Sequence, residues 1–329
     1  MSKRMRLVMA FALVMGFVGA FWIITPNMPH VLAQDANTPR DTTAAQSTTE
    51  RGTTAQGAMT GDWTASLNKD NSKIHLNLER RSDRGGRNQM GQTFEFSDFQ
   101  GLSRETALNG GPVRFSLVRE AGRIDLEGAF QNGKGSGTFT FTGNPSFVSA
   151  MKSRGFDFEA ARSNRHNDND DEDRLFAATT LNVTTALADD LNSIGLGKLG
   201  VDDLFKAAIF KIDSTFAREM KASGFEQLGM EELVKARIFK IDAAFVRQVS
   251  QMGFEKEPFE SIVKMQIFKV TPEFIAEVRN EGLSATQIED IVKLRIFKID
   301  AEFIREAKAD GVPLEVERLV QRKIGVRRH

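Results

Sequence analysis

The alternation of apolar and polar residues follows two different patterns along the chain, and the first fills residues 61–143. In KIHLNLE (73–79), Ile74, Leu76 and Leu78 fall on one face and the polar residues on the other. The same period of two recurs in WTASL (63–67), TFEF (93–96), VRFSLV (113–118), RIDLEG (123–128) and GTFTFTG (137–143). Such alternation is typical of antiparallel strands with one buried face. We therefore predict an antiparallel β meander domain of about six strands over 61–143, with a loop rich in Gly and Arg at 81–91.

The second pattern is a 29-residue repeat that follows the predicted strands. One segment occurs four times, as KAAIFKID (206–213), KARIFKID (235–242), KMQIFKVT (264–271) and KLRIFKID (293–300). Glycines recur at the same spacing, at Gly195, Gly224, Gly253, Gly282 and Gly311, with a weaker copy at 174–196 and a half-copy at 145–155. A fixed period of this length is typical of stacked repeats. We predict an α+β chain in which a short α-solenoid of about five two-helix repeats occupies 144–315.

Each repeat is expected to form two short helices. In IEDIVKLRIFKI (288–299), the apolar residues gather near one helix face, so Ile296 and Phe297 are expected to pack in the seam between repeats. Asp300, or Thr271 in the preceding copy, supplies a capping oxygen for the second helix, which Gly311 ends. Neither helix is long enough to be stable alone, so stacking provides the stability.

The N-terminal segment predicts export. Basic residues at positions 3, 4 and 6 precede an uncharged run from Leu7 to Thr25. This is the pattern of a signal peptide, cleaved after Ala33, and the run is also nearly long enough to remain as a membrane anchor. With either outcome, residues 1–33 place the rest of the chain outside the inner membrane, in the periplasm or anchored facing outward.

Three further segments have compositions that set them apart from the folded regions. Residues 34–60 are rich in Thr and poor in large apolar residues, which predicts a disordered linker. Residues 162–173 contain the acidic run NDNDDED, which enlarges one glycine spacing and is expected to form an insertion loop. The repeat register breaks after 315, so residues 316–329 are expected to be a basic C-terminal tail.

Charge and cysteine content exclude several kinds of function. The 44 basic and 44 acidic residues cancel, so the strong positive field of a nucleic-acid-binding protein is missing. The chain has no cysteine, which excludes disulfides, thiolate metal sites and a catalytic thiol. Neither HExxH nor GxSxG occurs, so the sequence gives no motif for a zinc hydrolase or a serine hydrolase. We expect a non-enzymatic protein.

Lysines at two repeated positions are the candidate binding residues. The first ladder is Lys206, Lys235, Lys264 and Lys293, and the second ladder is Lys211, Lys240, Lys269 and Lys298. Stacked repeats would align each ladder as a row of positive charge that suits an acidic partner. Alternatively, the first ladder pairs with acidic residues three or four positions earlier in its own helix, and the second lies in the last helical turn, where a cation is favourable.

Other candidate sites have weaker support from their residues. In the acidic run, Asp168, Asp170 and Glu172 alternate as calcium ligands do, but Asp173 replaces the glycine that the loop requires. GLGKLG (195–200) matches a dinucleotide motif but follows a helical pattern instead of a strand. GAFQNGKG (128–135) resembles a phosphate-binding loop but lacks the Ser or Thr after the lysine. We therefore expect neither a metal site nor a cofactor.

The opening of the β domain supports an alternative function. GDW (61–63) resembles the Gly-x-Trp start of lipocalin-like barrels. On this interpretation the β domain is a partial barrel that carries a small apolar ligand around Trp63, although six strands fall short of the eight in a lipocalin.

The repeats also resemble those of a known class of proteins. Their pattern, L-x-x-[RQ]-I-F-K-[IV]-[DT]-x-x-F-[IV]-R-x-x-x-x-x-G over about 145–315, resembles short helical repeats of exported bacterial proteins. It is also similar to repeats in the extracytoplasmic tails of membrane metallopeptidases of the beta-lactam-sensor antirepressor type. Those relatives carry His-Gly where this chain has Phe-Lys, and their zinc motif is missing here, so peptidase activity is not implied. The resemblance implies a sensing or interaction module located in the cell envelope. We expect an extracytoplasmic module that binds an envelope protein or polymer through the β domain and the repeat surface.

Overall fold

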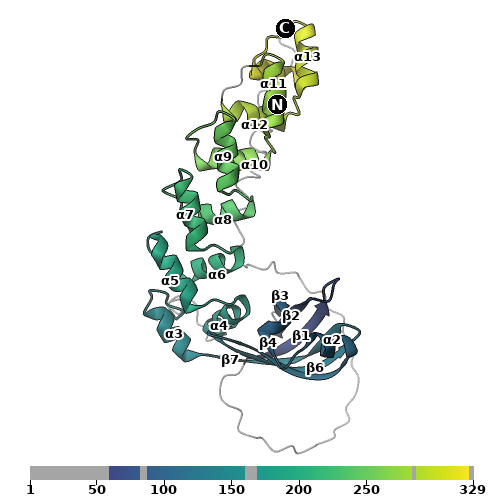
Figure 1. Cartoon of the computed structure of the whole chain (residues 1–329), viewed down its shortest axis with the longest axis vertical. Coiled ribbons are helices and arrows are strands. Elements are labelled where there is room, and N and C mark those ends of the chain that lie inside the picture. The colour runs from purple at the N-terminus through teal and green to yellow at the C-terminus, as the bar shows by residue number, and fades with distance from the viewer. Residues whose placement is uncertain (1–58, 82–86, 160–168, 284–286, 326–329) are drawn as a thin grey trace, which may run out of the picture. The chain divides into compact units, whose positions relative to one another are not determined.

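The computed structural model describes residues 59–81, 87–159, 169–283 and 287–325 (Figure 1). All of them belong to one unit of the chain, 55–329. The predicted signal or anchor (1–33) lies outside the described residues, as does the predicted linker apart from Met59 and Thr60, which open the first strand.

The β domain is an antiparallel sheet of seven strands, and the meander prediction is confirmed. The strands are β1 (Met59–Leu67), β2 (Lys73–Arg81), β3 (Arg87–Glu95), β4 (Phe99–Gln100), β5 (Gly111–Arg119), β6 (Gly122–Gln131) and β7 (Lys134–Gly143). The seventh strand is the short β4, and β3 occupies part of the segment expected as a loop. The short helices η2 (Phe96–Asp98) and α2 (Arg104–Asn109) were not predicted.

The sheet curls into a half-barrel. Its strand order is β3-β2-β1-β7-β6-β5-β4. Strands β1 and β7, the first and last in the sequence, are therefore paired, and the two edge strands are β3 and β4, which are consecutive in the sequence. Three strand spacings would separate β1 from β5 by roughly 14 Å in a flat sheet. The ring centroids of Trp63 and Phe115, from these two strands, are only 5.4 Å apart. At the edges, Phe94 and Phe99 also meet at 5.2 Å.

The helical part consists of two rows of short helices. One row contains α4 (Asn169–Leu181), α6 (Val201–Phe210), α8 (Met230–Ile238), α10 (Phe259–Ile267), α12 (Ile288–Ile296) and α14 (Val316–Lys323). The other contains α3 (Pro145–Lys152), α5 (Thr185–Ile194), α7 (Ser214–Ala222), α9 (Ala243–Gln251), α11 (Pro272–Asn280) and α13 (Ala301–Ala309). Consecutive helices of the first row pack one against the next from α4 to α14, and those of the second row do so from α3 to α9 and from α11 to α13. The two rows run side by side (Figure 1), which is consistent with the predicted helical repeat.

Local sequence explains where the helices of the second row begin and end. The Asp242 side chain accepts a hydrogen bond from the Phe245 backbone N–H at 2.8 Å, and Asp300 accepts one from Phe303 at 2.9 Å. Thr271 provides the same cap for Phe274 at 3.3 Å. The five repeated glycines that follow these helices all have positive φ, from 71° to 102°. These caps and glycine stops were predicted from the sequence.

The prediction that the repeated isoleucines are buried between repeats is wrong at two positions. Ile209 and Ile238 are exposed, by 53% and 40%, instead of buried. The residues that fill the seam are the buried ones two positions before and three positions after each isoleucine, such as Ala236 and Ile241. The reason is that α8 ends at Ile238 and the chain then turns, which brings Ile241 into the core while Ile238 stays outside.

Two segments that were expected to lie outside the repeats contain helix. The acidic segment 162–173 enters α4 from Asn169 onward. The segment expected as a basic tail contains α14, which packs against α12 and α13 and buries Leu319 and Val320.

Helix α4 connects the two kinds of structure. Phe176 lies in the sheet core, where its ring stacks on Phe139 and meets Phe141 edge-on, both at 5.4 Å between centroids. Asp173 forms an ion pair with Arg80 of β2. Helix α4, the first helix of its row, therefore covers part of the half-barrel interior.

Candidate interaction surface

The first lysine ladder is paired across repeats. Its distances to acidic residues of the next repeat are 2.5 Å for Lys206–Glu231, 2.6 Å for Lys235–Glu260, 3.7 Å for Lys264–Glu289 and 2.5 Å for Lys293–Glu317. Lys206 also pairs with Asp203 in its own helix at 3.3 Å, and Lys293 with Asp290 at 3.8 Å. The intrahelical pairs were anticipated, whereas the pairs between repeats were not.

These pairs occupy the first ladder, and at two of its lysines they also raise the pKa. Burial lowers the pKa of Lys206, but hydrogen bonds to Glu231 and Asp203 outweigh burial, so its pKa lies above the ordinary value. The hydrogen bond to Glu317 raises the pKa of Lys293. Partly exposed ion pairs contribute about 0.2–1 kcal/mol each to stability. We interpret the first ladder as a set of ties between repeats, because a partner would have to displace its acidic residues.

The second ladder has a different environment. Its four lysines lie in the turn that follows each helix, not in the last helical turn, and their φ values are 53°, 55°, 52° and 53°. All four are exposed, and none forms an ion pair with a residue in the described parts of the chain. This left-handed conformation costs roughly 1–2 kcal/mol for a residue other than glycine, and helices usually end there with Gly or Asn.

The next repeat holds this turn in place. Arg237 donates from Nη2 to the Lys211 carbonyl oxygen at 2.7 Å, and its guanidinium lies 3.7 Å from the Phe216 ring centroid. Arg295 similarly donates from Nε to the Phe268 carbonyl oxygen at 3.1 Å. The next repeat therefore holds the backbone at Lys211 and next to Lys269, and contacts of this kind allow an unfavourable conformation to persist.

This conformation leads to a stability prediction. Replacing Lys240 with asparagine is expected to leave the free energy of unfolding unchanged or to raise it slightly, because Asn tolerates the left-handed region. Lys240→Val is expected to lower it by about 1–2 kcal/mol, because a β-branched residue is strained there. Urea unfolding followed by circular dichroism measures both values. Equal stability of the two variants would contradict the left-handed turn.

Isoleucines lie between the two ladders in the sequence of each repeat. Ile209 and Ile238 each lie three residues after a first-ladder lysine and two residues before a second-ladder lysine. They are two of the five large apolar side chains that are exposed within the described residues, while Ile267 and Ile296 are half-buried. Sequence reasoning missed this exposed surface because an Ile-Phe pair in a helical repeat resembles core.

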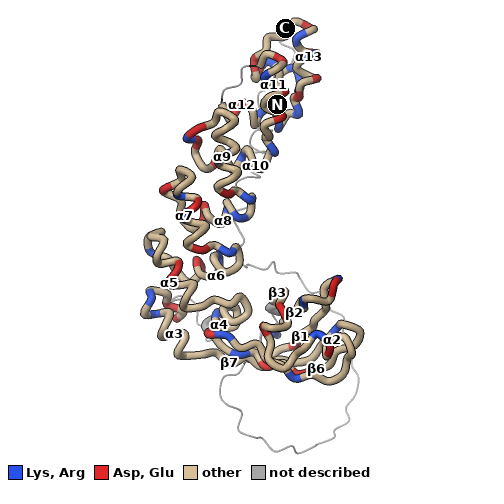
Figure 2. The backbone as a smooth tube through the Cα atoms, viewed as in Figure 1, with Lys and Arg blue, Asp and Glu red and all other residues tan. Residues whose placement is uncertain are grey.

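Basic and acidic residues are interspersed along the helical rows (Figure 2). The pairing described above uses the lysines and glutamates of the first row of helices. Asp213, Asp242 and Asp300, two residues after their second-ladder lysines, cap the following helices. The second ladder therefore remains as a repeated cation without an ion-pair partner among the residues described.

Trp63 lies inside the half-barrel. It is 1% exposed, contacts Phe115 and Phe130 at 5.4 and 5.6 Å, and donates its indole N–H to the Glu127 carbonyl oxygen at 3.1 Å. A ligand that contacts this ring would have to displace its aromatic neighbours. The position is that of a core tryptophan, and its role in ligand binding stays a prediction.

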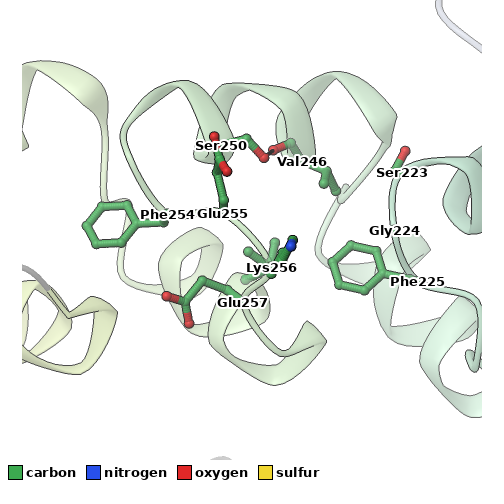
Figure 3. A pocket seen from close by; sticks show the side chains of 10 residues that line it. Ser223, Gly224, Phe225, Val246, Ser250, Phe254, Glu255, Lys256 and Glu257 are labelled. Atoms are coloured by element: carbon green, nitrogen blue, oxygen red, sulfur yellow. Dashed lines mark hydrogen bonds between the residues drawn. The ribbon is translucent and has the colours of Figure 1, made fainter.

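A hollow of about 360 Å³ lies between consecutive repeats. Figure 3 shows Phe225 and Phe254 on opposite sides of it, with Lys256 between them. Glu255 and Glu257 flank this lysine in sequence, so the hollow has no excess of positive charge. Its mixed lining indicates no particular ligand chemistry.

The remaining candidate sites are described only in part. The side chains of Asp168, Asp170 and Glu172 lie outside the described residues, and elsewhere in the described chain no group of three or more His, Asp or Glu could hold a metal ion. Within that same part of the chain, every helix is too short or too polar to cross a membrane.

Comparisons with protein-family models, curated proteins and solved structures find no match for this chain. The resemblance of the repeats to extracytoplasmic repeats of membrane metallopeptidases therefore stays a prediction.

Proposed function

We propose that this chain is a non-enzymatic, extracytoplasmic interaction protein whose helical repeats bind an acidic partner in the cell envelope. The partner is an envelope protein or polymer, and the second lysine ladder is the binding element. Export rests on the basic and apolar pattern of residues 1–33.

One observation carries this proposal: four exposed, unpaired lysines occupy the same left-handed position in consecutive repeats of the described chain. Packing does not require a lysine there, because Gly or Asn would suit the turn better. Strained positions that the surrounding structure holds in place are common at functional sites. A row of like charges fits an anionic partner, since it raises the local concentration of oppositely charged groups.

Capture from an envelope extract tests the proposal. The tagged full chain is compared with a variant in which Lys211, Lys240, Lys269 and Lys298 are all changed to asparagine, which suits the turn. We expect the variant to lose at least ten-fold in the amount of one specific bound species, measured by quantitative mass spectrometry. Capture by the unmodified chain should fall as salt rises from 50 to 500 mM, because exposed charges are screened.

A control variant with the same change in net charge distinguishes a specific role of the second ladder from a general effect of positive charge. Lys69, Lys134, Lys198 and Lys308 are exposed lysines outside the repeated position. Changing these four to asparagine should leave capture of the same species intact. Equal losses in the two variants, or no loss in either, would contradict a role for the second ladder.

A further inference from the structure

We infer that the second ladder and its neighbouring isoleucines bind an extended acidic peptide segment in which carboxylates recur about every third residue, with apolar residues between them. This inference rests on the proposed function and specifies the chemistry of the partner. The surface consists of Lys211, Lys240, Lys269 and Lys298 together with Ile209 and Ile238, and we call it the Ile-Lys surface.

The spacing of the lysines sets the spacing of the carboxylates. The helices that precede them, α6, α8, α10 and α12, pack one against the next. Packed helix axes are about 8–10 Å apart, so successive lysines follow one another at roughly that interval. A peptide in the extended polyproline II conformation advances about 3.1 Å per residue and completes a turn in three residues, so every third side chain lies on the same face at intervals of roughly 9 Å. A carboxylate at every third position can therefore meet a lysine in each repeat.

The exposed isoleucines distinguish a peptide from a purely anionic polymer. Ile209 and Ile238 expose 53% and 40% of their surface, and each is two residues from a ladder lysine. Apolar surface of this kind gains free energy when it is covered, but a polyanion has no apolar group to cover it. Because Ile267 and Ile296 are half-buried, apolar contact should be concentrated at the α6–α8 end of the surface.

The charges around the surface favour a partner that brings its own carboxylates. The nearby glutamates are already paired across the repeats with the lysines of the first ladder. The aspartates after the second ladder accept hydrogen bonds from the helices that they cap, as Asp213 does from the Phe216 backbone N–H at 2.8 Å. The third repeat has Thr271 in place of this aspartate. No carboxylate in the described residues therefore neutralises the ladder by an ion pair.

Synthetic peptides test the inference on the full chain. A fluorescent twelve-residue peptide has Glu at every third position and Leu after each Glu, and a second peptide of identical composition has its glutamates in one block. Anisotropy titration should give at least ten-fold tighter binding of the spaced peptide. Ile209→Ser with Ile238→Ser should weaken the spaced peptide at least five-fold, and should leave binding of polyglutamate unchanged.

Two results would overturn the inference. Equal affinity for the spaced and blocked peptides would mean that the surface responds only to net charge, as expected for binding of an anionic polymer. If the isoleucine substitutions do not weaken binding of the spaced peptide, the isoleucines are not part of the binding surface. The proposed function fails separately: it falls if the four-lysine variant still captures the envelope partner, and it stands if that capture is lost while the spaced peptide does not bind.

Discussion

Replacing Phe176 with alanine should destabilise the chain by about 3–5 kcal/mol, the usual range for a buried aromatic residue. Phe176 is 7% exposed, and its ring lies 5.4 Å from both Phe139 and Phe141 in the half-barrel. The substitution removes the aromatic contact by which α4 joins the sheet core. The β domain and the repeats should then unfold in separate transitions instead of together.

Two optical probes distinguish these transitions. Trp63 lies in the half-barrel, and its fluorescence reports on the β domain once the chain's other tryptophan, Trp22, is changed to phenylalanine. Circular dichroism at 222 nm reports mainly on the helices. The two curves should coincide in the parent chain and separate in Phe176→Ala. As a control, Phe239→Ala removes a half-buried ring from the repeats but leaves the contact between α4 and the sheet intact, so its two curves should still coincide. Coincident curves in Phe176→Ala would show that α4 does not couple the two parts.

The sequence predicted the fold class well because both kinds of pattern are local. Alternation over short runs gave six of the strands, and the 29-residue period gave the helix pairs with their caps and glycine stops. The curl of the sheet and the burial of Phe176 in it have no local signal. They depend on residues such as Trp63 and Phe115, which are far apart in sequence and meet only when the strands close.

The sequence predicted which lysines form the candidate surface, but not which of them are paired or exposed. Both lysine ladders were visible as repeated residues, yet only the structure separates them. Lys206 meets Glu231 because α6 packs against α8, and this pairing is set by stacking and not by helical spacing. Ile238 was assigned to the core because a continuous helix would place it beside Ile241. The left-handed turn at Lys240 interrupts that helix and leaves Ile238 exposed.

Gly137→Ala is the second substitution from which we expect a large loss, about 3–5 kcal/mol, at the upper end for single changes. Gly137 of β7 lies directly opposite Gly128 of β6. A Cβ atom at position 137 would overlap the Glu127 carbonyl oxygen and lie 2.6 Å from the Gly128 Cα. Both are backbone atoms, so no side-chain rotation can relieve the overlap, and the two strands would have to move apart. The same carbonyl accepts the indole N–H of Trp63.

Gly91→Ala is the matched control because it places the same methyl group in the same sheet. There the new Cβ would lie 3.4 Å from His75 Nε2 and 3.5 Å from Asn77 Oδ1, which is ordinary contact. Its stability should stay within about 0.5 kcal/mol of the parent. Gly137→Ala should in addition shift the Trp63 emission to longer wavelength, because separation of β6 and β7 admits water to the indole. If the Gly137→Ala protein keeps the stability and emission of the parent, β6 and β7 do not pair in this register. The described packing of the half-barrel around Trp63 would then be wrong.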